Sequence, residues 1–332
     1  MIDKALWIRE YKSARWILWL MPIAHFLALG LQRMNRWVFA PEAELFRDLA
    51  RLPQWLHGPY DDGSLEMGAR LLLTLAALAL ALIQLGGERR NGTQELLFSL
   101  PYSRRRLFAA KWLVGVTGIA GATAFGTGID MIVVAASPIA PYFDLGYHAA
   151  QFVYSTLAVS AAYSLALFLG SITGSVASQA ALSLLMWLLP GGILFLLHAF
   201  LAMHGVADQH FEHYWYMEGF LFFITYMVLP FDEFHPLRYG VLAILLLAGT
   251  AFGAAAYERN RTENNGKLML FPVWERTLQV GFVTCFALLC ALIGSLLLRI
   301  GTPLVSYYIG GIAGLLIGWR LIVRLTRMRL KI

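Results

Sequence analysis

The chain has 332 residues, of which 59% are apolar and only 14% are charged, whereas about a quarter of the residues in an average soluble domain are charged. This composition excludes an ordinary soluble protein. The apolar runs are long and continuous, so they predict helices and not the alternating strands of a membrane barrel. The excess of six positive charges does not indicate a nucleic-acid partner, because the basic residues gather at the ends of the apolar runs. We therefore expect an all-α, polytopic membrane helix bundle.

The pattern predicts about eight transmembrane helices in a single transmembrane domain that covers residues 1–332. Residues 1–15 alternate charged side chains with Leu6, Trp7 and Tyr11, which predicts a helix lying in the membrane interface. The expected spans are 16–31, 68–86, 112–136, 149–169, 179–203, 238–256, 277–298 and 303–322.

Three connecting segments carry further signals. Residues 41–52 place leucines and a phenylalanine on one face and charged side chains on the other, which predicts an amphipathic surface helix outside the membrane. Residues 204–237 form an external loop whose apolar stretch, 220–229, is too short for a bilayer core that needs about 20 residues. We interpret that stretch as re-entrant or interfacial. Residues 87–111 and 257–276 are predicted to be cytoplasmic loops.

The distribution of basic residues tests this topology. With eight spans and both termini inside, 19 Lys and Arg residues lie on the cytoplasmic side and 7 on the outer side. A ninth span over residues 217–230 would invert the last part of the chain and give 12 inside and 14 outside. Because basic residues concentrate on the cytoplasmic side of membrane proteins, the count favours eight spans.

The most polar stretch of the chain, 86–112, lies between two apolar runs and predicts a short helix followed by the start of a second helix. Asn91 or Thr93 could cap the short helix, and Gln94 and Glu95 occupy its first turn, where the helix dipole favours polar and negative groups. Pro101 disfavours helix at the residue before it. Beyond the proline, a cap on the next helix is expected from Ser103.

This stretch resembles the first cytoplasmic loop of ABC-2 type transporter permeases. The residues that carry the resemblance are Glu88, Gly92-Thr93, Glu95-Leu96-Leu97, Ser99-Leu100-Pro101, Ser103-Arg104 and Lys111. In that family the loop holds a short coupling helix that docks on a partner ATPase. An ordinary amphipathic connector at the inner membrane surface is the alternative interpretation.

The second predicted cytoplasmic loop is similar to a string that a subset of these permeases carries before its last helix pair, although the spacing from Arg261 to Phe271 is one residue short. The family also has an elbow helix where residues 1–15 lie. Carried over position by position, the resemblance implies ATPase contacts at Glu88, Gly92, Thr93, Glu95, Leu96, Leu97, Leu100, Glu263 and Gly266. Gln94 is expected to be an exposed neighbour of Glu95, so Gln94→Ala should be nearly silent.

The resemblance further implies an ABC exporter subunit that pairs with a cytosolic ABC ATPase and with a second permease chain, identical or different. It implies a place in the bilayer of a bacterial plasma membrane, with both termini cytoplasmic. The chain contains no G-x-x-x-x-G-K-[ST] phosphate loop, so ATP and Mg²⁺ are expected on the partner and no cofactor or catalytic residue on this chain.

Small residues recur at helical spacing in two spans. In the third span they predict a bundle or dimer helix, and in the last span they predict close packing, because small side chains let two helix backbones approach. These helix-packing positions are Gly118, Gly121 and Gly126, then Gly310, Gly314 and Gly318.

An aspartate in the third span and a group of histidines in the external loop are possible ion sites, but each has a simpler interpretation. Asp130 is interpreted as a solvated or capped carboxylate at the interface and not as an ion ligand. His204, His210 and His213, with Asp208 and Glu212, could form an external metal site, but a wet, aromatic-rich loop explains them as well, so no metal is predicted.

An ATP-independent carrier or a polytopic membrane enzyme is the rival class. A carrier is expected to place polar groups and broken helices near the membrane midplane, whereas the polar residues here fall mainly in the predicted loops. An intramembrane enzyme would need a motif such as H-E-x-x-H or paired carboxylates, and none is recognised in the sequence.

Overall fold

The structure is a computed structural model that describes residues 4–61, 63–206, 225–228, 236–260, 262–298 and 301–327. Within these ranges the chain is helical, apart from turns and one isolated backbone bridge between Thr173 and Met269. The described part contains eight helices that are long and apolar enough to cross a membrane. The fold is therefore the expected all-α polytopic helix bundle, and the chain is a multi-pass membrane protein.

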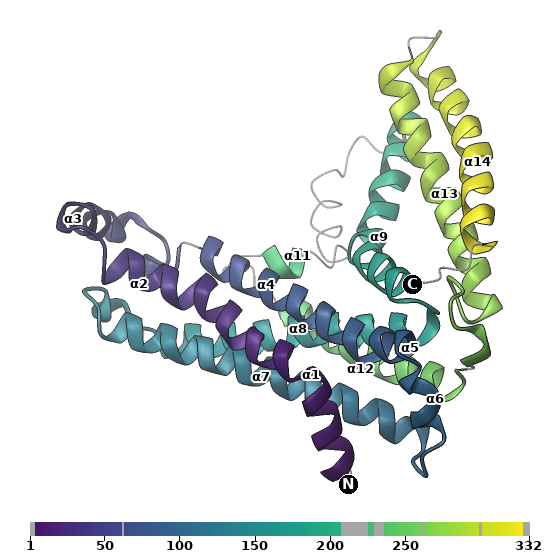
Figure 1. Cartoon of the computed structure of the whole chain (residues 1–332). Coiled ribbons are helices and arrows are strands. Elements are labelled where there is room, and N and C mark those ends of the chain that lie inside the picture. Colours follow the sequence, from purple (N-terminus) through teal and green to yellow (C-terminus); the bar gives the residue numbers. More distant parts are fainter. Residues whose placement is uncertain are drawn as a thin grey trace.

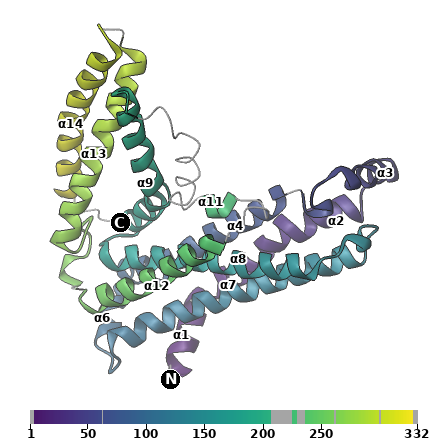
Figure 2. The same cartoon turned by 180° about the vertical axis from the view of Figure 1, so that it is seen from behind.

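The first membrane-spanning rod comprises α1 (Lys4–His25), a π-helical turn (Phe26–Gly30) and α2 (Leu31–Trp37). The interfacial helix expected over residues 1–15 is not a separate element, because α1 continues through that boundary without a break. Its first turns nevertheless point in a different direction from the rest of the rod (Figures 1 and 2). The placement of these turns in the membrane surface remains a prediction.

The rod packs with four other long elements into the main bundle. α4 (Gly63–Ala81) continues through a π-helical turn (Leu82–Gly87) into α5 (Glu88–Arg90), and α7 runs from Arg104 to Ala135. The most deeply buried helix is α8 (Leu145–Ile172), which packs against α12 (Pro236–Glu258). The core combines aromatic rings with small side chains, including Ala158, Ala162 and Tyr163.

Three helices form a second group that projects from the main bundle (Figure 1). They are α9 (Val176–Met203), α13 (Pro272–Leu297) and α14 (Pro303–Arg327). α13 and α14 form a tight hairpin, in which a Cβ atom on Gly310 would clash with the Cys290 carbonyl oxygen. Gly314 and Gly318 extend the same contact along α13, against Cys290 and Phe286. The small residues of the last span therefore face a neighbouring helix of the same chain.

The two ends of the main bundle carry different short helices. At one end lie α3 (Glu42–Arg51) and the connections around it, and at the other end lies α6 (Thr93–Phe98) (Figure 1). α3 matches the amphipathic surface helix expected over residues 41–52. The expected loop 204–237 falls mostly outside the described residues, which include only its two ends and the short α11 (Thr225–Val228).

The helices extend beyond most of the expected spans. α8 begins four residues before the expected 149 and α13 begins five before the expected 277. α7 begins at Arg104, so the polar start of this helix takes up the end of the expected loop 87–111. Hydropathy marks the apolar part of a span, whereas a helix continues into water as long as its backbone hydrogen bonds and caps allow.

Candidate functional site

α6 is a six-residue helix with two clearly different sides. It follows Gly92, whose φ of +68° lies in the left-handed region that favours glycine. Leu97 is 3% exposed and belongs to the main core, whereas Leu96 is 70% exposed and Leu100 is 41% exposed. Glu95 is also exposed. We call Glu95, Leu96 and Leu100 the coupling face.

Of the caps predicted for α6 and α7, only the one on α7 is confirmed. Gly92 occupies the cap position of α6 and provides no side chain, so neither Asn91 nor Thr93 caps this helix. The Thr93 hydroxyl instead donates to the Glu88 carbonyl oxygen at 3.3 Å. Ser103 caps α7 as expected, since its Oγ accepts a hydrogen bond from the Arg106 backbone N–H.

Next to α6 in the chain, α5 contributes to a largely buried group of four charged side chains, the inner ionic cluster: Arg9, Glu10, Glu88 and Lys111. The Lys111 ammonium is fully buried and lies 3.0 Å from a Glu10 carboxylate oxygen and 2.5 Å from one of Glu88. Arg9 is partly exposed and contacts both carboxylates, at 2.6 Å and 2.8 Å. Two positive and two negative charges therefore balance in this cluster, and they join α1, α5 and α7.

Glu88 therefore belongs to this internal cluster and is mostly buried. Its residue is 8% exposed, and the ATPase contact that the resemblance implies at this position stays a prediction. The signal that sequence reasoning missed is the stripe Leu6, Glu10, Ala14 on the buried face of α1. Residues at steps of four share one face of a helix, so a carboxylate stands there among apolar neighbours.

The second loop packs beside the first. Gln94 is 2% exposed, and its side-chain oxygen accepts a hydrogen bond from the Asn265 side-chain amide at 3.3 Å. The expectation that Gln94 is a silent surface position is therefore wrong. Gly266 has a φ of +89°, and its N–H donates to the Gly174 carbonyl in the turn between α8 and α9 at 2.8 Å. Glu263 is exposed on the outside of this loop.

Two arginine side chains donate hydrogen bonds to the loops at this end of the bundle. Arg104 donates to the carbonyl oxygens of Glu258 and Asn260, at 3.1 and 2.6 Å, and lies over the Phe98 ring. Arg89 donates to the Thr173 carbonyl oxygen at 2.5 Å. Arginine in the first turn of α7 opposes the helix dipole, and these contacts explain why Arg104 stands there. The α12–α13 loop thus holds α6 through Asn265 and Arg104, and the α8–α9 turn holds that loop and α5. We call these two connections the platform of α6.

At the other end of the bundle lies the outer ionic cluster: Arg33, Glu66, Arg70 and Asp130. Arg33 donates to Asp130 at 2.8 Å and lies 3.4 Å from Glu66, while Tyr147 donates to the same Glu66 carboxylate. All four charged residues are at most 1% exposed. The interpretation of Asp130 as a solvated or capped interface carboxylate is therefore wrong, because this side chain is buried in an ion pair.

The two clusters flank the apolar part of the bundle. Glu10 and Arg33 stand 23 positions apart on the first rod, which corresponds to about 35 Å of helix at 1.5 Å per residue. This separation slightly exceeds the roughly 30 Å hydrocarbon core of a bilayer. The expectation that polar groups fall mainly in loops is thus incomplete, since charged residues also lie on the helices, but near the ends of the spans and not at mid-depth.

The remaining candidate residues are placed as follows. Gly118 and Gly126 of α7 face α1, where a Cβ atom would clash with Leu18 and His25 respectively, whereas Gly121 faces open space. His204 contacts the Phe200 carbonyl and the Tyr308 hydroxyl, each at 2.7 Å. Four other proposed members of the external metal site lie outside the described residues: Asp208, His210, Glu212 and His213.

Comparison with known proteins agrees with this architecture. A search of curated protein sequences gives no match. The profile described as ABC-2 family transporter protein matches residues 59–298, which is more than half of the 332-residue chain and includes α6, the second loop and six of the eight long helices in full or nearly so. With eight apolar helices and a platform that holds a short exposed helix at one end of the bundle, the chain belongs to the ABC-2 transporter family.

Proposed function

We propose that the chain is the permease subunit of an ABC exporter and that a separate cytosolic ATPase docks on the coupling face. The observation that carries this proposal is the exposure of Leu96 on a helix whose opposite side is locked by Leu97 and Gln94. A leucine that is 70% exposed leaves apolar surface in contact with water. Beside an exposed carboxylate, that surface suits contact with a protein partner. Glu263 on the neighbouring loop would extend the contact.

The platform gives a route from the docking surface to the spans. Force on α6 would reach α5 through the two residues that join them, and Glu88 of α5 is ion-paired to Lys111 of α7 and, through it, to Glu10 of α1. Coupled elements that shift together are the usual way in which a local movement is transmitted to a membrane cavity. We infer that closure of the ATPase moves α1, α5 and α7 as a unit.

The proposal assigns ATP and Mg²⁺ to the partner ATPase and a second permease chain to the complex. Both termini are placed in the cytoplasm and the protein in a bacterial plasma membrane. The positive-inside bias supports this orientation, because 19 Lys and Arg residues then lie inside and 7 outside. The assignment of export as the direction rests on the family resemblance.

The rival carrier function is less well supported. A carrier that binds ions or substrate at mid-depth needs polar groups there, whereas the two ionic clusters lie about 35 Å apart along the first rod, near the ends of the spans. Each cluster also balances its own charges internally.

Charge reversal on the coupling face tests the proposal. Glu95→Arg should reach the membrane and remain folded, because the side chain is exposed, but it should weaken association with the ATPase. A hydrogen-bonded interface charge that loses its partner costs about 2–5 kcal/mol, whereas loss of a helix-dipole interaction costs about 0.3–1 kcal/mol. The readouts are co-purification of the ATPase and ATP-driven transport.

Glu44→Arg is the matched control, since Glu44 is also an exposed carboxylate in the first turn of a helix, but on α3 at the opposite end of the bundle. It should assemble and transport like the wild type. The purified chain alone should hydrolyse no ATP. Normal assembly and transport by Glu95→Arg would show that α6 is only a connector, and ATP hydrolysis by the lone chain would refute the assignment as a permease subunit.

A further inference from the structure

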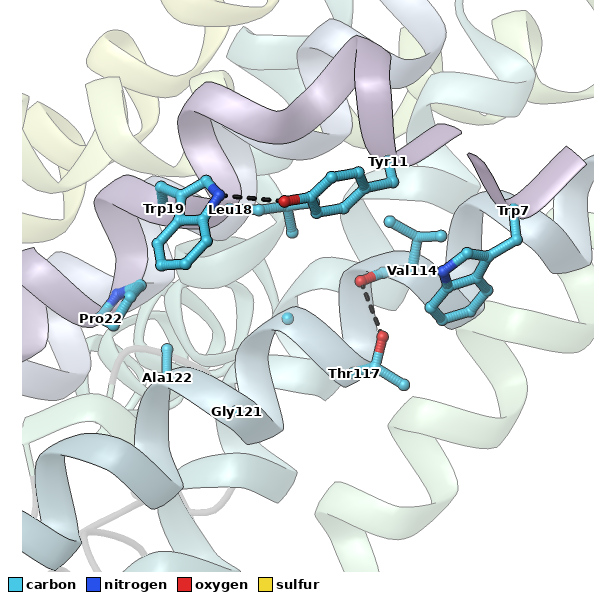
Figure 3. Close-up of a pocket in the computed structure, with 10 residues that line it drawn as sticks. Trp7, Tyr11, Leu18, Trp19, Pro22, Val114, Thr117, Gly121 and Ala122 are labelled. Carbon is cyan, nitrogen blue, oxygen red and sulfur yellow. Dashed lines mark hydrogen bonds between the residues drawn. The ribbon is translucent and has the colours of Figure 1, made fainter. Parts of the chain in front are cut away.

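A groove runs along the outside of the main bundle between α1 and α7 (Figure 3). Its volume is about 340 Å³, at the lower end of the roughly 300–1,000 Å³ of small-molecule sites. Three aromatic side chains of α1 line it, Trp7, Tyr11 and Trp19, and the floor is formed by small residues of α7 that include Thr117 and Gly121.

The packing of the two helices explains why the groove is open. Gly118 brings the helices together, because a Cβ atom at this position would clash with Leu18, whereas a Cβ atom on Gly121 would meet nothing within 4 Å. The Trp19 indole donates to the Tyr11 hydroxyl at 3.0 Å, which fixes both rings. The Thr117 hydroxyl donates to the Leu113 carbonyl oxygen of its own helix at 2.8 Å. The floor therefore presents little hydrogen-bonding capacity to an occupant.

Two basic residues of α1 lie near this apolar groove without lining it. Arg15 is four residues after Tyr11 and four before Trp19, so it lies on the same face of α1 as both, and Lys12 is one turn nearer the N-terminus. Both are exposed. In the described part of the chain neither forms an ion pair, and Arg15 lies over the Trp16 ring at 5.2 Å. An apolar channel lined by tryptophan and tyrosine, with exposed positive charge close to it, matches a lipid with a negative headgroup.

We propose that this groove binds one anionic phospholipid. An acyl chain lies along the space left by Gly121, and the phosphate is bound by Arg15 and Lys12. The bound lipid would hold α1 against α7 next to the Glu10–Lys111 contact. This site is independent of the ATPase-docking proposal, because it uses a different face and different residues.

A second copy of the chain fits the groove less well. In a two-fold interface the same patch faces itself, so Arg15 and Lys12 of one copy would approach Arg15 and Lys12 of the other. Like charges brought together at an interface are unfavourable. A phospholipid supplies both the apolar chain and the negative charge that the groove lacks.

Native mass spectrometry of the purified full-length chain tests the proposal, with dioleoylphosphatidylglycerol and dioleoylphosphatidylcholine as probes. The wild type should retain one phosphatidylglycerol in preference to phosphatidylcholine. Arg15→Gln should reduce phosphatidylglycerol binding about fivefold, the usual contribution of one basic side chain near an anionic lipid, and should leave phosphatidylcholine binding unchanged.

Gly121→Leu should fill the groove and abolish preferential retention of phosphatidylglycerol. Gly128→Leu is the matched control, because Gly128 lies two turns further along α7 and its side-chain position is also open. It should bind phosphatidylglycerol like the wild type. Equal retention of the two lipids by the wild type, or unchanged binding by Gly121→Leu, would overturn the proposal.

A cross-linking measurement tests whether a second copy of the chain occupies the groove instead. Gly121→Cys is introduced after Cys285 and Cys290 have been replaced by alanine, and the membranes are oxidised. The lipid proposal predicts no disulfide between two copies through position 121. Efficient disulfide formation between two copies through position 121 would show that a second chain fills the groove and would overturn the proposal.

Discussion

The two ionic clusters are built from similar charges but differ in how many contacts hold each charge. In the inner cluster one fully buried lysine holds two carboxylates, and those carboxylates come from α1 and from α5 next to the platform of α6. In the outer cluster two arginines lie with two carboxylates, and Tyr147 and the Pro59 carbonyl oxygen provide further hydrogen bonds. The inner cluster thus depends on a single fully buried cation, whereas the outer cluster has several alternative contacts.

This difference suggests a division of roles. A buried ion pair adds little net stability, because desolvation offsets much of the attraction, but removal of one partner is strongly destabilising. Redundant contacts at the outer end would hold the helices at fixed positions. The inner cluster, with its single lysine, would transmit movement from α6. Disruption of the inner cluster should therefore uncouple ATP hydrolysis from transport, and disruption of the outer cluster should mainly reduce stability.

The largest effect is expected at Lys111. Lys111→Met leaves Glu10 and Glu88 buried with only the partly exposed Arg9 as a counter-charge, so the free energy of unfolding should fall by about 3–5 kcal/mol. Thermal unfolding of the purified protein in lipid nanodiscs measures the loss. Adding Glu10→Gln and Glu88→Gln to Lys111→Met should restore part of the stability, because no carboxylate then remains unpaired. No recovery in the triple variant would contradict the pairing.

A smaller loss is expected in the outer cluster. Asp130→Asn removes the charge but keeps an oxygen that can accept from Arg33, which also retains Glu66 and the Pro59 carbonyl oxygen. We expect a loss of about 1–3 kcal/mol, measured by the same unfolding assay. The ratio of ATP hydrolysed to substrate transported should not change. A strong change in that ratio, with normal stability, would reverse the proposed roles of the two clusters.

The comparison also separates what the sequence could predict from what it could not. The apolar runs locate the spans, the amphipathic helical pattern of residues 41–52 predicts α3, and Ser103 is recognisable as a cap. The partners of the buried charges could not be derived, because Glu10 and Lys111 are 101 residues apart and Arg33 and Asp130 are 97 apart. Such contacts depend on the rotation and crossing of whole helices, which a periodic pattern in one helix does not determine.

The same limit applies to the coupling face. The motif includes Leu96, Leu97 and Leu100 without indicating which of them is buried, and the structure buries Leu97 and exposes Leu96 and Leu100. In so short a helix, the packing of the platform decides which side faces inward. Gln94 also could not be predicted as buried, because its contact, Asn265, lies in a loop 171 residues away.

Gly92 offers a local test of the platform. A side chain at its φ of +68° has free space around it, so Gly92→Ala should cost only the backbone strain of a left-handed residue, about 1–2 kcal/mol. Gly92→Asn should cost less, because asparagine adopts this conformation more readily. Comparable unfolding temperatures for the wild type and the alanine variant would show that α6 does not need the left-handed turn.

The smallest effect is expected for the contact between the two loops. Gln94→Ala removes its hydrogen bond to Asn265, which should cost about 0.5–1.5 kcal/mol. Asn265→Ala should cost a similar amount, and the double variant should lose less than the two single losses added together, because the partners are in direct contact. As a control, Arg105→Gln breaks an exposed ion pair with Glu258 and should change stability by under about 1 kcal/mol. Full additivity of the two alanine changes would show that the contact is absent in the membrane.

Site-specific photo-cross-linking tests the central claim, that the coupling face docks a cytosolic ATPase. A photoreactive phenylalanine is placed at Leu96 and, as a control, at Phe46 of α3, because both side chains are 70% exposed but lie at opposite ends of the bundle (Figure 1). On irradiation in cells, position 96 should capture an ATP-binding protein and position 46 should not. Capture at position 46 alone, or equal capture at both positions, would contradict the docking surface proposed for α6.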